Sequence, residues 1–149
     1  MAACPGVDPF DLARFVTAQD RAYPVALAEL RAGRKRSHWM WYVFPQLRGL
    51  GSSSLSWRYG VSGAEEATAY LAHRVLGPRL RESVAAMLST SCRDAAQILG
   101  EVDALKFRSC LTLFHAVSGE ALFDQALERF FAGARDPRTL AALASGGRS

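Results

Sequence analysis

The chain has 149 residues, of which 50% are hydrophobic and 21% charged, so it can bury a core and is not a disordered chain. No apolar run approaches the roughly 18 to 20 residues of a membrane span. The first ten residues lack the basic and apolar regions of a secretory signal. Three scattered cysteines without a C-x-x-C pair favour reduced thiols over a disulfide scaffold or a zinc site. We therefore predict one cytoplasmic domain, residues 1–149, with a core over 8–143 and flexible tails at 1–7 and 144–149.

The net charge of +4 comes from 18 basic and 14 acidic residues, and its positive excess is local. Between Glu29 and Glu65 there are six basic residues and no acid, so the remaining 12 basic and 14 acidic residues carry −2. A field concentrated in this way favours an anionic partner, either a phosphate-bearing small molecule or nucleic acid. A solvated basic turn without a partner is the alternative.

The first predicted element is a helix that starts at Asp8-Pro9 and ends at Gly33, with Pro24 expected to kink or split it. The segment 37–62 is predicted to be irregular or a small sheet. Its run WMWYVF is aromatic and β-branched, GLGSSSLS is not expected to be regular, and WRYGVS could supply a second short strand.

Helical patterns resume after Ser62. The predicted helices cover 65–73, 77–87, 91–100 with Ser91 as its cap, 102–117 ended by Ser118-Gly119, 121–131, and a last helix started by Asp136-Pro137. The fold class is therefore mainly α, with about seven helices and the 37–62 segment across one face.

The stretch RKRSHWMWYVFPQLRGLGSS, residues 34–53, combines basic, aromatic and small residues, and we predict that it forms the wall of a binding site. Its G-L-G lacks the third glycine of a dinucleotide fingerprint and the lysine of a phosphate-binding loop. The three histidines lack the short spacings of a metal site, so no metal and no cofactor is expected. His38 is either a general base or a structural histidine, and Asp103 and Lys106 stand at an ion-pair spacing.

The phrases RKRSHWMWYVFPQLRGLGSSSLSWRYGV, EEATAYLAHRVLGPRL and DALKFRSCLTLF resemble the bacterial family known as domain of unknown function 1810, over roughly residues 8–143. The resemblance implies a mostly helical, YbiA-like fold related to the NADAR proteins, which are proposed to handle NAD-derived or ADP-ribose-containing molecules. It places Phe44-Pro45-Gln46 at the first NADAR phrase and Glu66 at its glutamate, with Ala67 where the pattern has a histidine. Lys106-Phe107 matches a later K-F phrase.

Together these features predict a pocket for ADP-ribose, NAD or a similar phosphate-bearing ligand. Lys35 and Lys106 would supply countercharge, Trp41 a stacking plane, and Gln46 and Tyr59 hydrogen bonds. Glu66, and second to it Asp103, would be the catalytic carboxylate of N-glycosidic hydrolysis. We expect His38, Gln46 and Glu66 to share one cleft, with Phe44 beside it. A non-catalytic nucleotide- or nucleic-acid-binding module and a helical protein-interaction domain are the alternatives.

Overall fold

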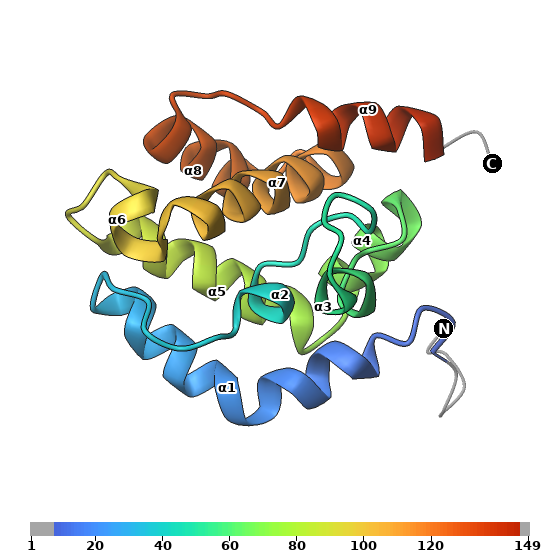
Figure 1. Cartoon of the computed structure of the whole chain (residues 1–149), viewed down its shortest axis with the longest axis horizontal. Coiled ribbons are helices and arrows are strands. Elements are labelled where there is room, and N and C mark those ends of the chain that lie inside the picture. The colour runs from blue at the N-terminus through green and yellow to red at the C-terminus, as the bar shows by residue number, and fades with distance from the viewer. Residues whose placement is uncertain (1–7, 147–149) are drawn as a thin grey trace.

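The computed structural model describes residues 8–146, which fold into a single, mainly α-helical domain (Figure 1). These residues contain nine helices and no strand. The helices are α1 (Ala13–Arg31), α2 (Met40–Val43), α3 (Ser54–Arg58), α4 (Ala64–Ala72), α5 (Leu76–Ser89), α6 (Ala95–Leu99), α7 (Glu101–Ser118), α8 (Ala121–Phe131) and α9 (Pro137–Gly146). Seven of them correspond to predicted helices. The two extra ones, α2 and α3, lie in the segment for which no helix was predicted.

Helix α1 begins later than its sequence signal suggests. Asp11 has a positive φ of 52°, which interrupts the chain between Pro9 and the helix. Asp8 nevertheless acts as a cap, because its carboxylate accepts the backbone N–H groups of Leu12 and Ala13, each at 2.9 Å. Pro24 lies within the helix and does not split it, and Figure 1 shows that α1 curves around the rest of the molecule.

Two alternatives were predicted for 37–62, irregular structure or a small sheet, and of these the small sheet is wrong. Between α2 and α4 the described chain forms one isolated parallel bridge, in which the Val61 N–H donates to the Gln46 carbonyl and the Arg48 N–H to the Val61 carbonyl. The physical reason is the burial pattern at the start of the segment, since Met40 and Val43 of α2 and Phe44 at its end are buried and recur at helical spacing. The serine-rich run is likewise helical, because the Ser53 hydroxyl accepts the Ser56 N–H and caps α3.

Helix α7 is the central element of the fold. It packs against α4, α6, α8 and α9, and Figure 1 shows it between α5 on one side and α8 and α9 on the other. Its inward side chains Phe107, Cys110 and Phe114 are fully buried, and Phe107 contacts Phe44 with ring centroids 4.7 Å apart. The core therefore forms around α7 and includes the aromatic residues of α2.

Two glycines allow the sharp turns at the ends of α7. Gly100, with φ 93°, separates α6 from α7, and Gly119, with φ 69°, ends α7 at the predicted position. The preceding helix was placed too early, because its cap is Asp94 and not Ser91. The Asp94 carboxylate accepts the Ala96 N–H at 2.9 Å.

Helix α9 starts at the predicted Asp136-Pro137 and runs to Gly146, so residues 144–146 are helical and not part of a tail. The predicted flexible tails otherwise fall on 1–7 and 147–149, outside the described residues, as does Cys4. Cys92 and Cys110 are free thiols, half-buried and buried. No helix in the described part of the chain has the length and hydrophobicity needed to span a membrane.

Candidate functional site

Two lysines converge on one carboxylate at the surface of α7. Lys35 Nζ lies 3.0 Å from Asp103 Oδ2, and Lys106 Nζ lies 3.2 Å from Asp103 Oδ1. The three side chains are only 10 to 20% exposed. These are the only lysines of the chain, since the other 16 of its 18 basic residues are arginines. We call Lys35, Asp103 and Lys106 the lysine cluster.

Three segments bring the cluster together. Asp103 and Lys106 stand one turn apart near the start of α7, as their spacing predicted, whereas Lys35 comes from the connection between α1 and α2. That connection is fixed to the end of α6, because the Lys35 N–H donates to the Ile98 carbonyl at 2.7 Å. A short loop and a helix start are thus held in one position by the backbone.

Each lysine also lies over an aromatic ring. Lys106 Nζ is 3.9 Å from the centre of the Trp41 ring, and Lys35 Nζ is 5.2 Å from that of Trp39. Trp39 is buried, whereas Trp41 is half-buried and keeps part of its ring at the surface. An ammonium over an aromatic face is a favourable cation–π contact. The cluster therefore presents cations beside an accessible indole.

Glu29 at the end of α1 anchors the loop that carries the cluster. Its carboxylate accepts the Arg36 and Ser37 N–H groups, the Ser37 hydroxyl and the Trp39 indole N–H, at 2.5 to 3.0 Å. Burial by itself raises the pKa of Glu29, but the hydrogen bonds from Ser37, Arg36 and Trp39 outweigh it and lower the pKa to about 2. The loop 35–39 is therefore held by an ionised carboxylate.

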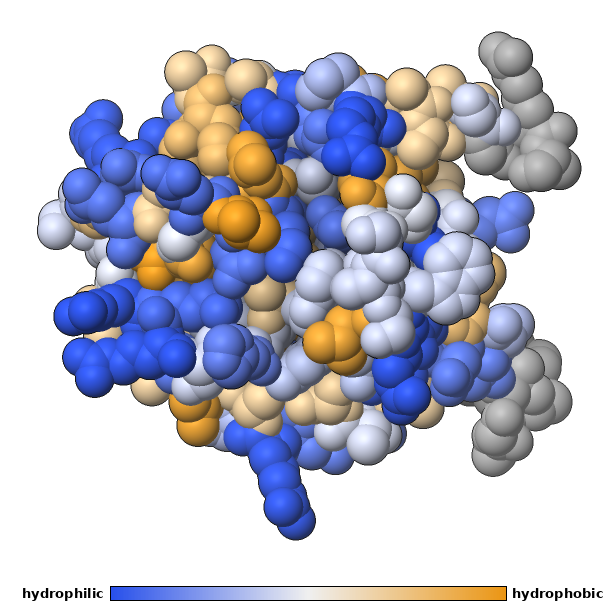
Figure 2. Space-filling view, in the orientation of Figure 1, coloured by the Kyte–Doolittle hydropathy of each residue, from blue (hydrophilic) through white to orange (hydrophobic). Residues whose placement is uncertain are grey.

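Two pockets meet at Trp41 and Lys106. The first, of about 120 Å³, is lined by the lysine cluster with His38, Trp39 and Trp41, and we call it the cationic pocket. The second, of about 180 Å³, is lined among others by Trp41, Gln46, Leu50, Val102, Leu105 and Arg138, and we call it the apolar pocket. Figure 2 shows hydrophobic side chains at the surface over α7, and the most exposed on this helix are Val102 and Leu105.

Gln46 is one of two buried polar residues of the apolar pocket, the other being Ser109. It is 8% exposed, and its side-chain amide makes no hydrogen bond to any described residue. The amide is not among the fully buried unpaired side-chain groups of the described residues, which are Arg108 Nε and Arg129 Nε, so it is not a group cut off from water without compensation. An amide in this state at a pocket wall is a group that a ligand can satisfy.

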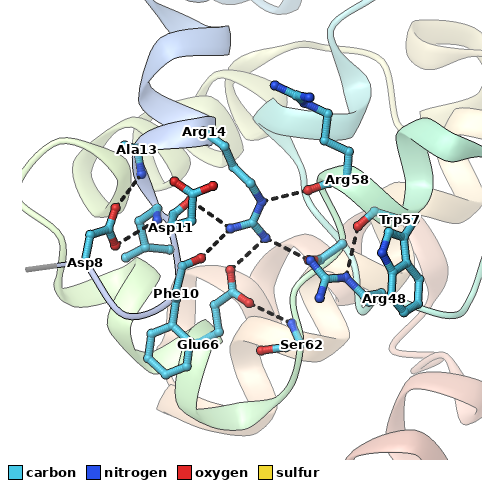
Figure 3. A network of polar contacts seen from close by, with 12 residues as sticks. Asp8, Phe10, Asp11, Ala13, Arg14, Arg48, Trp57, Arg58, Ser62 and Glu66 are labelled. Carbon is cyan, nitrogen blue, oxygen red and sulfur yellow. Dashed lines mark hydrogen bonds and ion pairs between the residues drawn. The ribbon is translucent and has the colours of Figure 1, made fainter.

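Glu66 lies elsewhere, in a network around Arg14 (Figure 3). Glu66 Oε2 is 2.8 Å from Arg14 Nη2, and Oε1 accepts the Ser62 N–H at 2.8 Å. Glu66 borders a third pocket of about 380 Å³, together with Phe10, Arg48 and residues of α9. Since both of its oxygens have protein partners, Glu66 serves here to join α1 to α4.

The expectation that His38, Gln46 and Glu66 share one cleft is wrong, because each lines a different pocket. Phe44 is 1% exposed and packs in the core, and Tyr59 packs on Phe15 and Tyr42, with ring centroids 6.0 and 5.3 Å apart. The structure does bring together Lys35, His38, Trp41, Asp103 and Lys106, with Gln46 in the adjoining pocket. Glu66 is separated from these residues because its carboxylate is held by Arg14 of α1.

Sequence reasoning missed Val102, Leu105 and Arg138, which complete the apolar pocket. Their sequence context is an ordinary amphipathic helix and a helix start, and neither carries a ligand signal. The restriction of lysine to two positions is a signal that was available in the sequence. In the described residues no group of three His, Cys, Asp or Glu side chains could hold a metal ion.

Comparisons with known proteins give a family and a fold. The family described as protein of unknown function (DUF1810) matches residues 9–143. The crystal structure of the conserved hypothetical protein Rv1873 from Mycobacterium tuberculosis is 51% identical, with a TM-score of 0.90, over 92% of this chain and 99% of that one. The search of curated proteins found no match. The chain thus shares its helical fold with this relative over the matched 92% of its length.

Proposed function

Because the chain belongs to the DUF1810 family of proteins of unknown function, its activity has to be inferred from its own side chains. We propose that it binds a phosphate-bearing small molecule, of the ADP-ribose or NAD type, at the lysine cluster. The observation that carries the proposal is the convergence of both lysines of the chain on Asp103, beside the accessible ring of Trp41.

The charge balance of the cluster suits an anion. Two ammonium groups share one carboxylate, which leaves one positive charge in a pocket whose side chains are mostly buried. Each ammonium has three donors and gives one to Asp103, so further donors remain for phosphate oxygens. A phosphate is bound more strongly in such a partly desolvated setting than at an exposed basic turn.

The resemblance to NADAR proteins expected from the sequence points in the same direction. The YbiA-like fold and the link to NADAR proteins, both expected from the sequence phrases, favour an ADP-ribose-containing ligand. Among the residues matched to NADAR phrases, Gln46 and Lys106 line the two pockets beside Trp41, whereas Glu66 does not. The proposed ligand site is therefore centred on Trp41 and Lys106.

Hydrolysis of an N-glycosidic bond is the second candidate, and it is favoured by one observation. Asp103 is the only acidic residue that lines either pocket in the described chain. In that reaction Asp103 would accept a proton from the attacking water while the bond between the sugar carbon and the base nitrogen breaks and the base leaves. Asp103 would first have to release a lysine, so binding is the function that the geometry supports better.

The direct test is a titration of ADP-ribose, NAD and AMP against the wild-type protein, Lys35→Met and Lys106→Met, by calorimetry and thermal unfolding. A ligand at 100 times its dissociation constant should stabilise the wild type by roughly 2.7 kcal/mol. Both variants should lose most of this effect. Arg93→Met is the matched control, because it removes a charge from an exposed residue that lines neither pocket. Equal losses in all three variants, or no binding by the wild type, would contradict the proposal.

The small number of lysines allows a second readout. An amine-specific reagent can modify only the side chains of Lys35 and Lys106, besides the terminal amine. Bound ligand should slow modification of both lysines, as followed by mass spectrometry, without changing the labelling of the terminal amine. Release of ADP-ribose from ADP-ribosylated nucleic acid or protein, or of nicotinamide from NAD, measures the hydrolytic candidate in the same samples.

The alternative is nucleic-acid binding through exposed residues such as Arg34, Arg36 and Arg58. The salt dependence of the affinity distinguishes it from binding of a small molecule. Polymer binding should weaken steeply between 50 and 200 mM salt, in proportion to the phosphates neutralised. A small molecule in the cationic pocket should respond much less.

A further inference from the structure

The apolar pocket differs in chemistry from the cationic pocket next to it. Its wall includes Leu50 and the two exposed residues Val102 and Leu105, which are 68% and 58% exposed. Trp41 and Lys106 belong to both pockets, so a ligand held by the lysines would reach the apolar pocket by passing Trp41. A ligand that fills both pockets would therefore have an anionic part joined to a flat apolar part.

The polar groups of the apolar pocket are already paired, with one exception. The Ser109 hydroxyl donates to Asp136, and Arg138 Nη2 donates to the Leu50 carbonyl at 2.8 Å. Lys106 donates to Asp103. The side-chain amide of Gln46 has no such partner among the described residues, and the residue as a whole is 8% exposed.

Gly51 lies close to this amide. A Cβ atom at Gly51 would stand 3.8 Å from Gln46 Nε2 and 2.9 Å from the Cβ of Ser56. A side chain at this position would collide with Ser56 and would lie in van der Waals contact with the amide.

We propose that the apolar pocket holds the heterocyclic base of a nucleotide whose phosphate lies at the lysine cluster, and that Gln46 reads the edge of that base. The inference rests on the proposed function and specifies its ligand. An amide presents a donor and an acceptor side by side, which complements a base edge with an adjacent donor and acceptor, as in adenine. Trp41, which lines both pockets, stacks on one face of the ring, and Val102 and Leu105 contact the other.

The test compares three ligands that share a phosphate by calorimetry: AMP, the purine ribonucleoside 5′-monophosphate that lacks the 6-amino group, and ribose 5-phosphate. The wild-type protein should bind AMP about tenfold or more tightly than ribose 5-phosphate, with the purine nucleotide between them. A tenfold ratio corresponds to about 1.4 kcal/mol. Gln46→Met keeps the length of the side chain and removes the amide. It should weaken AMP binding several-fold, to the level at which the wild type binds the purine nucleotide, and leave ribose 5-phosphate unchanged.

A second pair of variants tests the same inference at exposed residues, where a substitution does not disturb the core. Leu105→Ala shortens the wall of the apolar pocket and should weaken AMP but not ribose 5-phosphate. Leu140→Ala is the matched control, because Leu140 is also an exposed leucine, 44% exposed, and lines neither pocket. Thermal unfolding of each variant establishes that it is folded.

The outcomes separate this inference from the proposed function. If the wild type binds AMP and ribose 5-phosphate equally, or if Gln46→Met weakens both alike, the base does not occupy the apolar pocket, while phosphate binding stands. If neither compound binds the wild type, the proposed function fails and the inference fails with it. Loss of AMP selectivity in Gln46→Met and Leu105→Ala, with the control unchanged, supports it.

Discussion

Arg14 and Glu66 form a buried ion pair, with Nη2 and Oε2 2.8 Å apart, although the two residues are 52 positions apart in the chain. The same guanidinium donates to the carbonyls of Phe10, Arg58 and Gly60 (Figure 3). One side chain thus ties the start of α1, the end of α3 and the first turn of α4 together. The pair therefore stabilises the fold, whereas the sequence analysis predicted Glu66 to be a catalytic carboxylate.

We expect Glu66→Gln to destabilise the protein without changing ligand binding at Trp41. The substitution leaves the Arg14 charge buried without its counter-ion, and losing one partner of a buried pair costs about 3 to 5 kcal/mol. Chemical denaturation gives the change in the free energy of unfolding. Glu65→Gln is the control, because Glu65 is exposed and its change should stay within about 0.5 kcal/mol. Unchanged stability together with lost binding would instead return Glu66 to the site.

Because Glu29 anchors the loop as an ionised carboxylate, the free energy of unfolding should fall when the pH is lowered into the acidic range. Its pKa is lowered to about 2 in the folded protein, so its stabilising effect is complete above the unfolded value of 4.5 and is lost as the pH falls toward 2. We expect the difference in unfolding free energy between the wild type and Glu29→Gln to be about 1 kcal/mol at pH 7, because solvent screens a partly exposed carboxylate. The difference should vanish near pH 2. A constant difference between pH 7 and 2 would contradict this role.

Asp136 should decide whether α9 stays docked on α7. Its buried carboxylate accepts the hydroxyls of Ser109 and Thr139, each at 2.6 Å, and its N–H donates to Thr112. Burial raises the pKa of Asp136, but the hydrogen bonds from Ser109 and Thr139 outweigh it and the pKa is lowered.

We expect Asp136→Ala to cost about 2 kcal/mol or more, since it removes a cap and takes a charged hydrogen-bond acceptor from two buried hydroxyls. Hydrogen exchange of the α9 amides measures the local effect, which should exceed the effect on α1. The control is Asp124→Ala, which removes a half-exposed ion pair with Arg135. It should cost about 1 kcal/mol or less. Equal losses in the two variants would show that Asp136 has no special role.

Trp41 should be the tryptophan that contributes to ligand binding. We expect Trp41→Ala to weaken nucleotide binding by about 1 to 3 kcal/mol, the usual contribution of an aromatic ring that stacks on a base. Trp57 is the matched control, because it is 64% exposed on α3 and has its own cation–π partner, Arg48, at 4.7 Å. Calorimetric titration of AMP compares the two. Similar weakening in both variants would indicate binding at a general aromatic surface.

Much of the helical framework follows from local sequence. Gly119 and Asp136-Pro137 mark the end of α7 and the start of α9 because glycine at positive φ and proline in a first turn act through backbone conformation, which needs no distant partner. The ion pair of Asp103 and Lys106 follows from their spacing for the same reason. The expected strand in WMWYVF failed because aromatic and β-branched residues suit buried helices as well as strands, and tertiary contacts decided between them.

The sequence by itself determined the helical class, the local caps and the concentration of positive charge before α4. Only the tertiary structure decided which side chains share a pocket. Lys35 reaches Asp103 because its backbone is bonded to Ile98, and Glu66 leaves the site because Arg14 lies next to it, both through contacts between residues far apart in the chain. Periodicity and composition describe neighbours within a few residues, whereas these contacts depend on how α1, α4 and α7 pack around a common core.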